Sequence, residues 1–219
     1  MAYCVHCMVS DVMKHQYSHD QITRFFAKED YDQQQYWQVI KPLVRQLEQD
    51  DGLIVVDDTI EEKPYTDEND IVSWHYDHTT GQNVKGINIV NFLYHRDSAN
   101  APEVSLPLAY EVVSKPDESV DPKTNKTKRK SRISKNTLVR DRLKILCRQN
   151  RVRFKYVAFD RWFSSKENMA MIKQELRKDF VCAIKANRTV ALSETDKRTG
   201  NFMQVSSVEF QPTELRGAI

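Results

Sequence analysis

Two runs of apolar residues, each closed by an acidic residue, constrain the fold of this chain more than any other feature. The runs occupy residues 53–59, LIVVDDT, and residues 156–161, YVAFDR. An acid directly after apolar strand residues is costly unless it emerges at an edge, where water or a cation meets its charge. In open α/β sheets, ligands bind beyond the carboxyl ends of parallel strands. The pattern therefore predicts two strands that bring carboxylates into one crevice, where they can bind a hard cation.

Length and composition predict a globular protein. The 219 residues, 40% hydrophobic and 29% charged, suffice for one domain with an appended segment. The net charge of +2 is only mildly basic, so local clusters of charge say more about nucleic-acid binding than the total does. No run approaches the ~18 apolar residues that span a bilayer, and the start of the chain lacks the pattern of a signal peptide. We expect no membrane association and a cytoplasmic location.

The cysteines predict no disulfide framework, which fits a reducing compartment. Cys147 and Cys182 lie in apolar stretches, where cysteine behaves as a small hydrophobic residue. Near the start of the chain, four residues have the pair spacings of zinc ligands: Cys4, Cys7, His15 and His19. The gap between the two pairs is shorter than the roughly twelve residues of a ββα zinc finger. A frayed terminus is therefore the alternative to structural zinc.

Residues 18–48 have the apolar spacing of helices. Two stripes carry this pattern: Ile22, Phe25 and Phe26, then Trp37, Ile40, Val44 and Leu47. Pro42 interrupts the second stripe and predicts a kink or a helix that starts near it. Because no basic recognition helix is visible, a helical segment packed on the core is favoured over helix-turn-helix binding of DNA.

From residue 52 onward the pattern changes to strands, which we expect over 53–58, 86–95 and 104–113, the last two antiparallel. A long loop rich in Ser, Pro, Asp and Lys follows over 114–135. A helix then begins, capped by Ser134 or Asn136. Its apolar stripe consists of Val139, Leu143, Leu146 and Cys147. The strand that ends in Asp160 comes after this helix.

A capping box formed by Ser164 and Glu167 opens a further helix. Its inner face is expected to carry Met169, Ile172 and Leu176. Another strand is predicted over 180–184, and more β-structure over 190–192 and 202–208. The order strand, strand, strand, helix, strand, helix, strand predicts an α/β protein with a mixed sheet and flanking helices, arranged as in the ribonuclease H-like fold.

We expect three parts along the chain. Residues 1–50 form a helical segment, 51–186 form the ribonuclease H-like core, and 187–219 form the start of a β-rich insertion.

In this order the first and fourth strands can lie side by side and parallel, so Asp58 and Asp160 emerge at one edge. Phosphodiester chemistry by two metal ions ~3.5–4 Å apart needs such acids. All-oxygen ligands suit Mg²⁺, with Mn²⁺ as the alternative. For residues 57–59 a strand-ending turn is the competing interpretation. For Asp160 the competing role is a helix cap, which Ser164 and Glu167 already supply.

The loop over 114–135 contains a strongly basic segment. Its cationic residues are Lys123, Lys126, Lys128, Arg129, Lys130 and Arg132. These charges repel one another unless they meet an anion, so the segment is interpreted as an arm that contacts DNA phosphates. Such contacts position DNA without reading its sequence. A solvated surface loop is the alternative.

Three segments together resemble the catalytic domain of bacterial insertion-sequence transposases, which belong to the DDE superfamily with a ribonuclease H-like core. They are residues 52–64, the stretch from 74–78 to 86–88, and residues 159–163. The resemblance covers roughly residues 18–219. In that family the first catalytic aspartate precedes Thr, which matches Asp58 better than Asp57. The second is often followed by Arg, which matches Asp160 and Arg161, and Arg161 is counted among the expected DNA contacts.

The resemblance implies a cut-and-paste DNA transposase whose Asp58 and Asp160 bind Mg²⁺ or Mn²⁺. Double-stranded DNA is the implied partner, and a homodimer is implied for the full-length protein. The family's third acid is a glutamate on a helix with a tyrosine, arginine, glutamate and lysine signature, which is not found here. Glu194, Glu209 and Glu214 are expected in strand-like or loop sequence instead. The chain is therefore expected to be a truncated copy of such a transposase, and a catalytically inactive fragment that binds DNA or full-length transposase is the alternative function.

Overall fold

The computed structural model describes residues 14, 16–18, 20, 21, 24, 32–78, 80–98, 101–120, 122, 125 and 127–209. The chain divides into two compact units, Met1–Pro42 and Leu43–Ile219. Several residues of the sequence-based predictions lie outside the described residues: Cys4, Cys7, His15, His19, Ile22, Phe25, Phe26, Lys123, Lys126 and Glu214. Among the described residues, no helix has the length and apolar character needed to cross a membrane.

Helix α3 (Gln33–Leu47) begins at a reciprocal cap. The amide of Gln35 donates to Asp32 Oδ1 at 2.7 Å, and the amide of Asp32 donates to Gln35 Oε1 at 2.9 Å. The helix runs through Pro42 instead of starting near it, which corrects that part of the prediction. After α3, the carboxylate of Glu48 is buried and accepts hydrogen bonds from Arg45 at 2.8 Å and from the amide of Arg153 at 2.9 Å.

The second unit contains a six-stranded mixed sheet. Its strands are β1 (Leu53–Glu62), β2 (Val72–Asp77), β3 (Gln82–Ser98), β4 (Ala101–Val112), β7 (Tyr156–Phe159) and β8 (Asp179–Cys182). β3 is antiparallel to β1, and along its other edge it pairs first with β2 and then with β4. β7 lies parallel to β1, and β8 lies parallel to β7. The antiparallel pairing predicted for the second and third strands is confirmed.

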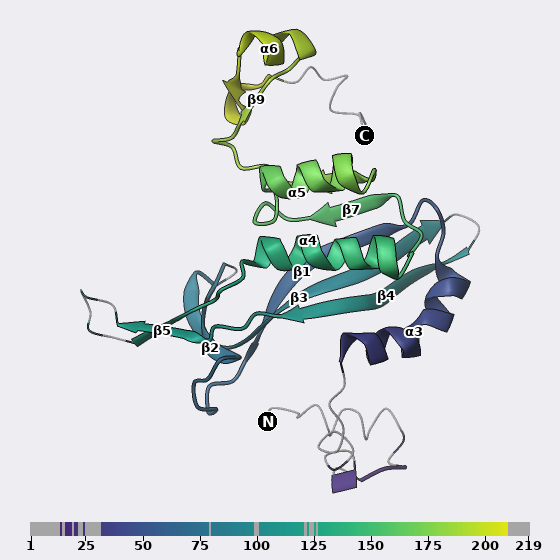
Figure 1. Ribbon diagram of the computed structural model, residues 1–219, viewed down its shortest axis with the longest axis vertical. Coiled ribbons are helices and arrows are strands. Elements are labelled where there is room, and N and C mark those ends of the chain that lie inside the picture. Colours follow the sequence, from purple (N-terminus) through teal and green to yellow (C-terminus); the bar gives the residue numbers. More distant parts are fainter. Residues whose placement is uncertain are drawn as a thin grey trace. The chain divides into compact units, whose positions relative to one another are not determined.

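Two helices connect the parallel part of the sheet. Helix α4 (Lys135–Lys144) continues into the π-helical turn Ile145–Gln149, and helix α5 (Lys166–Ala170) continues into the π-helical turn Met171–Glu175. Both lie on the same face of the sheet in Figure 1, as right-handed crossovers in one direction require. Ser134 caps α4, as predicted, by accepting from the amide of Thr137 at 3.1 Å. The cap of α5 is Ser165 and not the predicted Ser164, whose hydroxyl donates to the carbonyl of Arg161 at 2.8 Å.

The core lies between these helices and one face of the sheet, which we call the helix-covered face. Alternate strand residues are buried there: Ile54, Val56, Val90, Phe92, Val157 and Phe159. Val139, Leu143, Leu146 and Ile172 of the two helical segments are also buried. The side chain of Asn168 links the two helices. Its Nδ2 donates to Asn136 Oδ1 at 2.8 Å, and its Oδ1 accepts from Arg140 at 2.8 Å. Such fully bonded polar groups fix one packing of a core.

The order 4-3-1-7-8, with β2 beside the first half of β3, is the strand order of a ribonuclease H-like sheet. The expected α/β fold with a mixed sheet and flanking helices is therefore confirmed. The predicted long loop instead contains a hairpin of β5 (Asp117–Val120) and β6 (Thr127–Lys130). Past β8 the elements are short: β9 (Thr189–Val190), α6 (Glu194–Thr199), β10 (Met203–Gln204) and the 3₁₀ turn Val205–Ser207.

Candidate active site

The predicted acids lie at a step in the sheet, where β7 stops and β1 continues. Val56 of β1 pairs with Phe159, the last residue of β7. β1 itself runs on to Glu62 because β3 still pairs with it there. The predicted strand end at residue 58 is therefore wrong. Past the Val56–Phe159 pair, β1 and the chain that follows β7 are no longer joined as neighbouring strands. A cleft opens between them, and Asp57, Asp58 and Asp160 line it.

Asp58 points to the helix-covered face and is already compensated. Its Oδ2 accepts from Lys135 Nζ at 2.5 Å and from Asn88 Nδ2 at 2.9 Å. Lys135 is the first residue of α4, and Asn88 belongs to β3 and is fully buried. The side chain of Asp58 is 16% exposed. An ion pair this shielded joins the start of the helix to the sheet and leaves the Asp58 charge largely neutralised.

Asp57 points to the opposite face, because successive strand residues alternate. Partial burial raises the pKa of Asp57, and the negative charges of Asp160 and Asp58 raise it further. The amide of Asp58 donates to Asp57 Oδ1 at 2.9 Å and opposes this shift. Carboxylates that raise one another's pKa gain from a cation placed between them. The register places Asp57 at the level of Asp160, one residue past the Val56–Phe159 pair.

Asp160 also shapes the turn that leaves β7. Its Oδ1 accepts from the amide of Trp162 at 2.9 Å, and its carbonyl accepts from the amide of Phe163 at 3.3 Å. Asp160 does not cap α5, but it has another structural role here, because an aspartate commonly bonds the backbone two residues on. The same bond holds the carboxylate at the mouth of the cleft.

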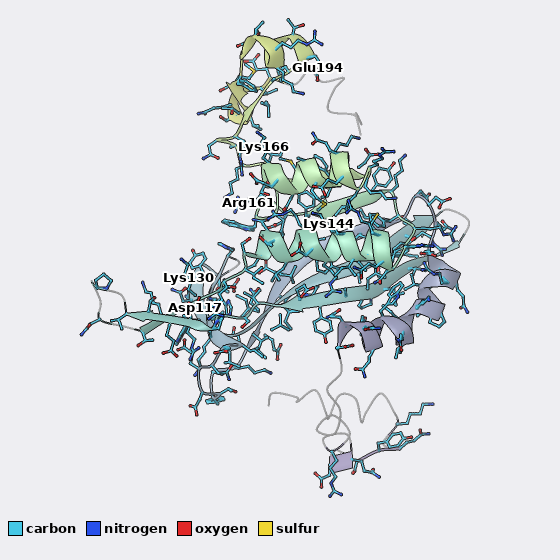
Figure 2. All side chains as sticks on the ribbon, in the orientation of Figure 1. Asp117, Lys130, Lys144, Arg161, Lys166 and Glu194 are labelled. Atoms are coloured by element: carbon cyan, nitrogen blue, oxygen red, sulfur yellow. The ribbon has the colours of Figure 1, made fainter. Side chains whose placement is uncertain are left out.

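The cleft has a volume of about 620 Å³ and an acidic lining. Among the described residues, its charged groups are Asp57, Asp58, Glu62, Asp77, Asp160 and Arg161. Figure 2 labels Arg161 at the end of β7, near the start of α5. Carboxylates in excess over cations raise the local concentration of divalent metal ions and repel phosphate. A cation bound here would offset this repulsion.

A buried polar layer lies next to Asp58. His75 is 5% exposed, and its Nε2 lies 3.1 Å from the hydroxyl of the fully buried Ser73. Burial lowers the pKa of His75 to about 4, and the charges of Lys115 and Lys135 add to the effect. His75 is therefore neutral at neutral pH. Within the described part of the chain, Asn88 Oδ1 is buried and accepts no hydrogen bond.

The donor set of the cleft fits a hard divalent cation. Asp57 and Asp160 offer carboxylate oxygens from adjacent parallel strands, and Mg²⁺ or Mn²⁺ prefers such ligands. Residues 32–78, 80–98, 101–120 and 127–209 contain no group of three or more His, Cys, Asp and Glu residues placed to hold a metal ion. The fit thus rests on a pair of carboxylates.

Neither described candidate for a third acid lines the cleft. Glu194 lies 3.5 Å from Lys197 and is the first residue of α6, so the expectation that it lies in strand or loop sequence is wrong. Ser193 caps this helix by accepting from the amide of Asp196, and Gly200 ends it with a φ of 75°. This cap and terminal glycine were the sequence signals for the helix. Glu209 lies in irregular structure, as expected.

The basic segment is balanced by acids of its own chain. Arg129 is 15% exposed and forms ion pairs with Asp70 at 3.0 Å, with Glu68 at 3.7 Å and with Glu118. Arg132 pairs with Asp117 at 2.7 Å. Lys128 and Lys130 of β6 are exposed, and Figure 2 labels Asp117 and Lys130 on the hairpin. The opposite charges of β5 and β6 could have predicted the hairpin from the sequence.

Sequence reasoning assigned no role to several residues of the site. Lys135 and Asn88 hold Asp58, and their partnership has no signal in the sequence because it depends on the fold. His78 and Trp162 lie on the wall of the cleft, and their rings stack at a centroid distance of 3.7 Å. The position of Trp162, two residues after Asp160, was the available signal.

Comparison with known proteins adds three findings. The sequence model of a family described as DDE superfamily endonuclease matches residues 5–201. A cryo-EM structure of piggyBac transposase in a synaptic complex with hairpin DNA is similar to the chain at 14% identity and a TM-score of 0.37; the match covers 85% of this chain and 38% of that one. No curated protein sequence matches.

Proposed function

The chain belongs to the DDE superfamily of endonucleases, and from this premise we propose that it acts on DNA as a transposase through the cleft lined by Asp57 and Asp160. The observation that carries the proposal is geometric: Asp57 and Asp160 each follow the paired residues Val56 and Phe159, and both line the cleft at the step between β1 and β7. It supports Asp57 as the first acid in place of Asp58, whose charge Lys135 compensates. Origin in a bacterial insertion sequence stays a prediction from the sequence motifs.

Mg²⁺ or Mn²⁺ is the proposed cofactor, held by Asp57 and Asp160. When bound, such ions lower the pKa of an attacking water or hydroxyl group and stabilise the leaving oxygen of a phosphodiester. Asp160 is oriented by its bond to the Trp162 amide, and Asp57 by its bond to the Asp58 amide. The Asp58–Lys135 pair fixes α4 against β1 behind these acids. Arg161, which lines the cleft, is proposed to contact a DNA phosphate.

Double-stranded DNA is the proposed partner. Lys128, Lys130, Arg132 and Arg161 are the described residues proposed to contact phosphates, with Lys123 and Lys126 kept as predictions. Arg129 is proposed to hold the hairpin instead, because three acids of the chain surround it. A homodimer is proposed for the complete transposase.

A nicking assay tests the cleavage proposal. Supercoiled plasmid is incubated with the chain and Mg²⁺ or Mn²⁺, and nicked product is measured. We expect nicking by the wild type and its loss in Asp57→Asn and Asp160→Asn, while Asp58→Asn retains more of it. Equal nicking by the wild type and Asp160→Asn would rule out catalysis at this cleft.

The alternative is a DNA-binding function without cleavage, which the exposed lysines of the hairpin favour. It predicts no metal-dependent nicking but DNA affinity that falls as salt rises. Affinity that does not change with salt would exclude phosphate contact by these residues.

A further inference from the structure

The wall of the cleft carries a cluster of rings that the proposed chemistry does not use. His78 stacks on Trp162 with an interplanar angle of 19°, and Tyr76 contacts His78 edge-on at 4.8 Å. All three residues line the cleft that holds Asp57 and Asp160. We call His78, Trp162 and Tyr76 the aromatic shelf. It joins the turn between β2 and β3 to the turn after β7.

Two rings of the shelf are exposed. Tyr76 is 51% exposed and Trp162 is 37% exposed. Packing of the core does not explain them, because in β2 the residues that point inward are Ser73 and His75. Exposed aromatic surface beside a polar cleft commonly marks a binding site.

Two cations lie over the ring of Trp162. Lys185 Nζ lies 4.5 Å from the centroid of the Trp162 ring, and Arg161 Cζ lies 5.3 Å from it. Lys185 follows β8, so a third segment of the chain converges on the shelf. Lys185 and Arg161 are thus cationic groups at the edge of a mainly acidic cleft, and they give a phosphate a place that the acids deny it.

Rings with neighbouring cations fit one ligand chemistry, a nucleotide whose base is not paired. A flat base stacks on an aromatic side chain while a cation meets its phosphate. A base within a duplex is covered on both faces by its neighbours and must leave the stack to make this contact.

We propose that the aromatic shelf binds an unpaired base of the DNA strand that enters the Asp57–Asp160 cleft. The inference rests on the proposed action on DNA and adds a preference for DNA that is unpaired at the reacting end. The shelf holds the base, and Arg161 and Lys185 hold the adjoining phosphate. A strand fixed at both points presents its backbone to the acids in one orientation.

Binding of two labelled probes tests this inference, with Ca²⁺ as the divalent ion. One probe is a blunt duplex, and the other is the same duplex with an unpaired thymidine tail. We expect the wild type to prefer the tailed probe and Trp162→Ala to bind it about 5- to 150-fold more weakly. The same variant should change blunt-duplex affinity little, and Trp162→Phe should keep most of the preference. Tyr65→Ala is the control, because Tyr65 is a fully exposed aromatic residue that does not line this cleft.

Tryptophan fluorescence gives a second readout that needs no Trp162→Ala protein. The chain contains three tryptophans, so Trp37→Phe with Trp74→Phe leaves Trp162 as the reporter. The tailed probe should quench its emission and the blunt duplex should not.

Three outcomes would overturn the shelf. The first is that Trp162→Ala loses affinity equally for the tailed and the blunt probe. The second is that this variant prefers the tailed probe as strongly as the wild type does. The third is that the tailed probe does not quench the emission of Trp162. A wild type that nicks plasmid yet shows one of these results disproves the shelf alone. A wild type that neither binds nor nicks DNA removes the proposed function as well.

Discussion

At the level of single residues, the acids around the cleft differ in whether a cationic side chain is bonded to them. Asp58 lies 2.5 Å from Lys135, whereas Asp57 meets the charge of Asp160. Two neighbouring aspartates can differ in this way because a strand turns consecutive side chains to opposite faces. Partial burial, and then the charges of Asp160 and Asp58, raise the pKa of Asp57, so its charged form gains from a nearby cation.

The buried imidazole of His75 predicts a pH dependence of stability. Its pKa is about 4 in the folded chain, against 6.5 for an exposed histidine. Between these values the unfolded chain binds a proton that the folded chain does not, so stability is complete above pH 6.5 and falls as the pH drops towards 4. The loss is up to roughly 3 kcal/mol at the low end of this range.

Urea unfolding at a series of pH values measures this effect. His75→Gln should flatten the profile between pH 4 and 6.5. A His75→Gln protein with the same slope as the wild type would contradict the assignment of this titration to His75.

The choice between Asp57 and Asp58 could not be made reliably from the sequence. Both follow the same apolar run, and only the register of β1 with β3 and β7 decides which face each one meets. The position of Asp160 could be predicted, because an acid after a short apolar run emerges at the edge of a sheet.

At the level of elements, the sequence predicted most accurately those helices and strands whose apolar side chains face the core. β1, β3, β4, β7 and α4 were found because their apolar residues follow the core periodicity. β2 was missed because its pattern is inverted, with Ser73 and His75 buried and Trp74 and Tyr76 exposed. β5 and β6 were missed because they contribute almost nothing to the core and are held by cross-strand ion pairs.

The β5–β6 hairpin carries two kinds of basic residue, and we expect them to contribute differently to the salt dependence of DNA affinity. Lys130 is exposed and proposed to contact phosphate, so Lys130→Ala should lower the slope of log affinity against log salt by about 1. Arg129 is held by carboxylates, so Arg129→Ala should leave the slope unchanged and loosen the hairpin.

DNA binding over a salt series measures the slope, and hydrogen exchange of residues 117–120 and 127–130 measures the hairpin. We expect faster exchange in Arg129→Ala than in Lys130→Ala. If Arg129→Ala lowers the slope as much as Lys130→Ala does, Arg129 contacts phosphate and the division between the two residues is wrong.

At the level of the whole molecule, the sheet determines where the chemistry can occur. The antiparallel strands extend past the parallel ones, and the acids lie at the resulting step. One crevice therefore collects Asp57 and Asp160 from distant parts of the sequence together with Arg161 and the aromatic shelf. The strand order could be predicted from the alternation of strands and helices, but the step could not, because it depends on unequal strand lengths.

Direct measurement of Mn²⁺ binding tests the central claim, that Asp57 and Asp160 share a divalent cation. Titration followed by the electron paramagnetic resonance of free Mn²⁺ gives the affinity without requiring cleavage. Asp57→Asn and Asp160→Asn should each weaken binding by at least about tenfold. Asp58→Asn combined with Lys135→Met, which removes the ion pair and keeps the net charge, should bind within a few-fold of the wild type. Loss of binding in that double variant, together with retention in Asp57→Asn, would contradict the account and assign the cation to Asp58.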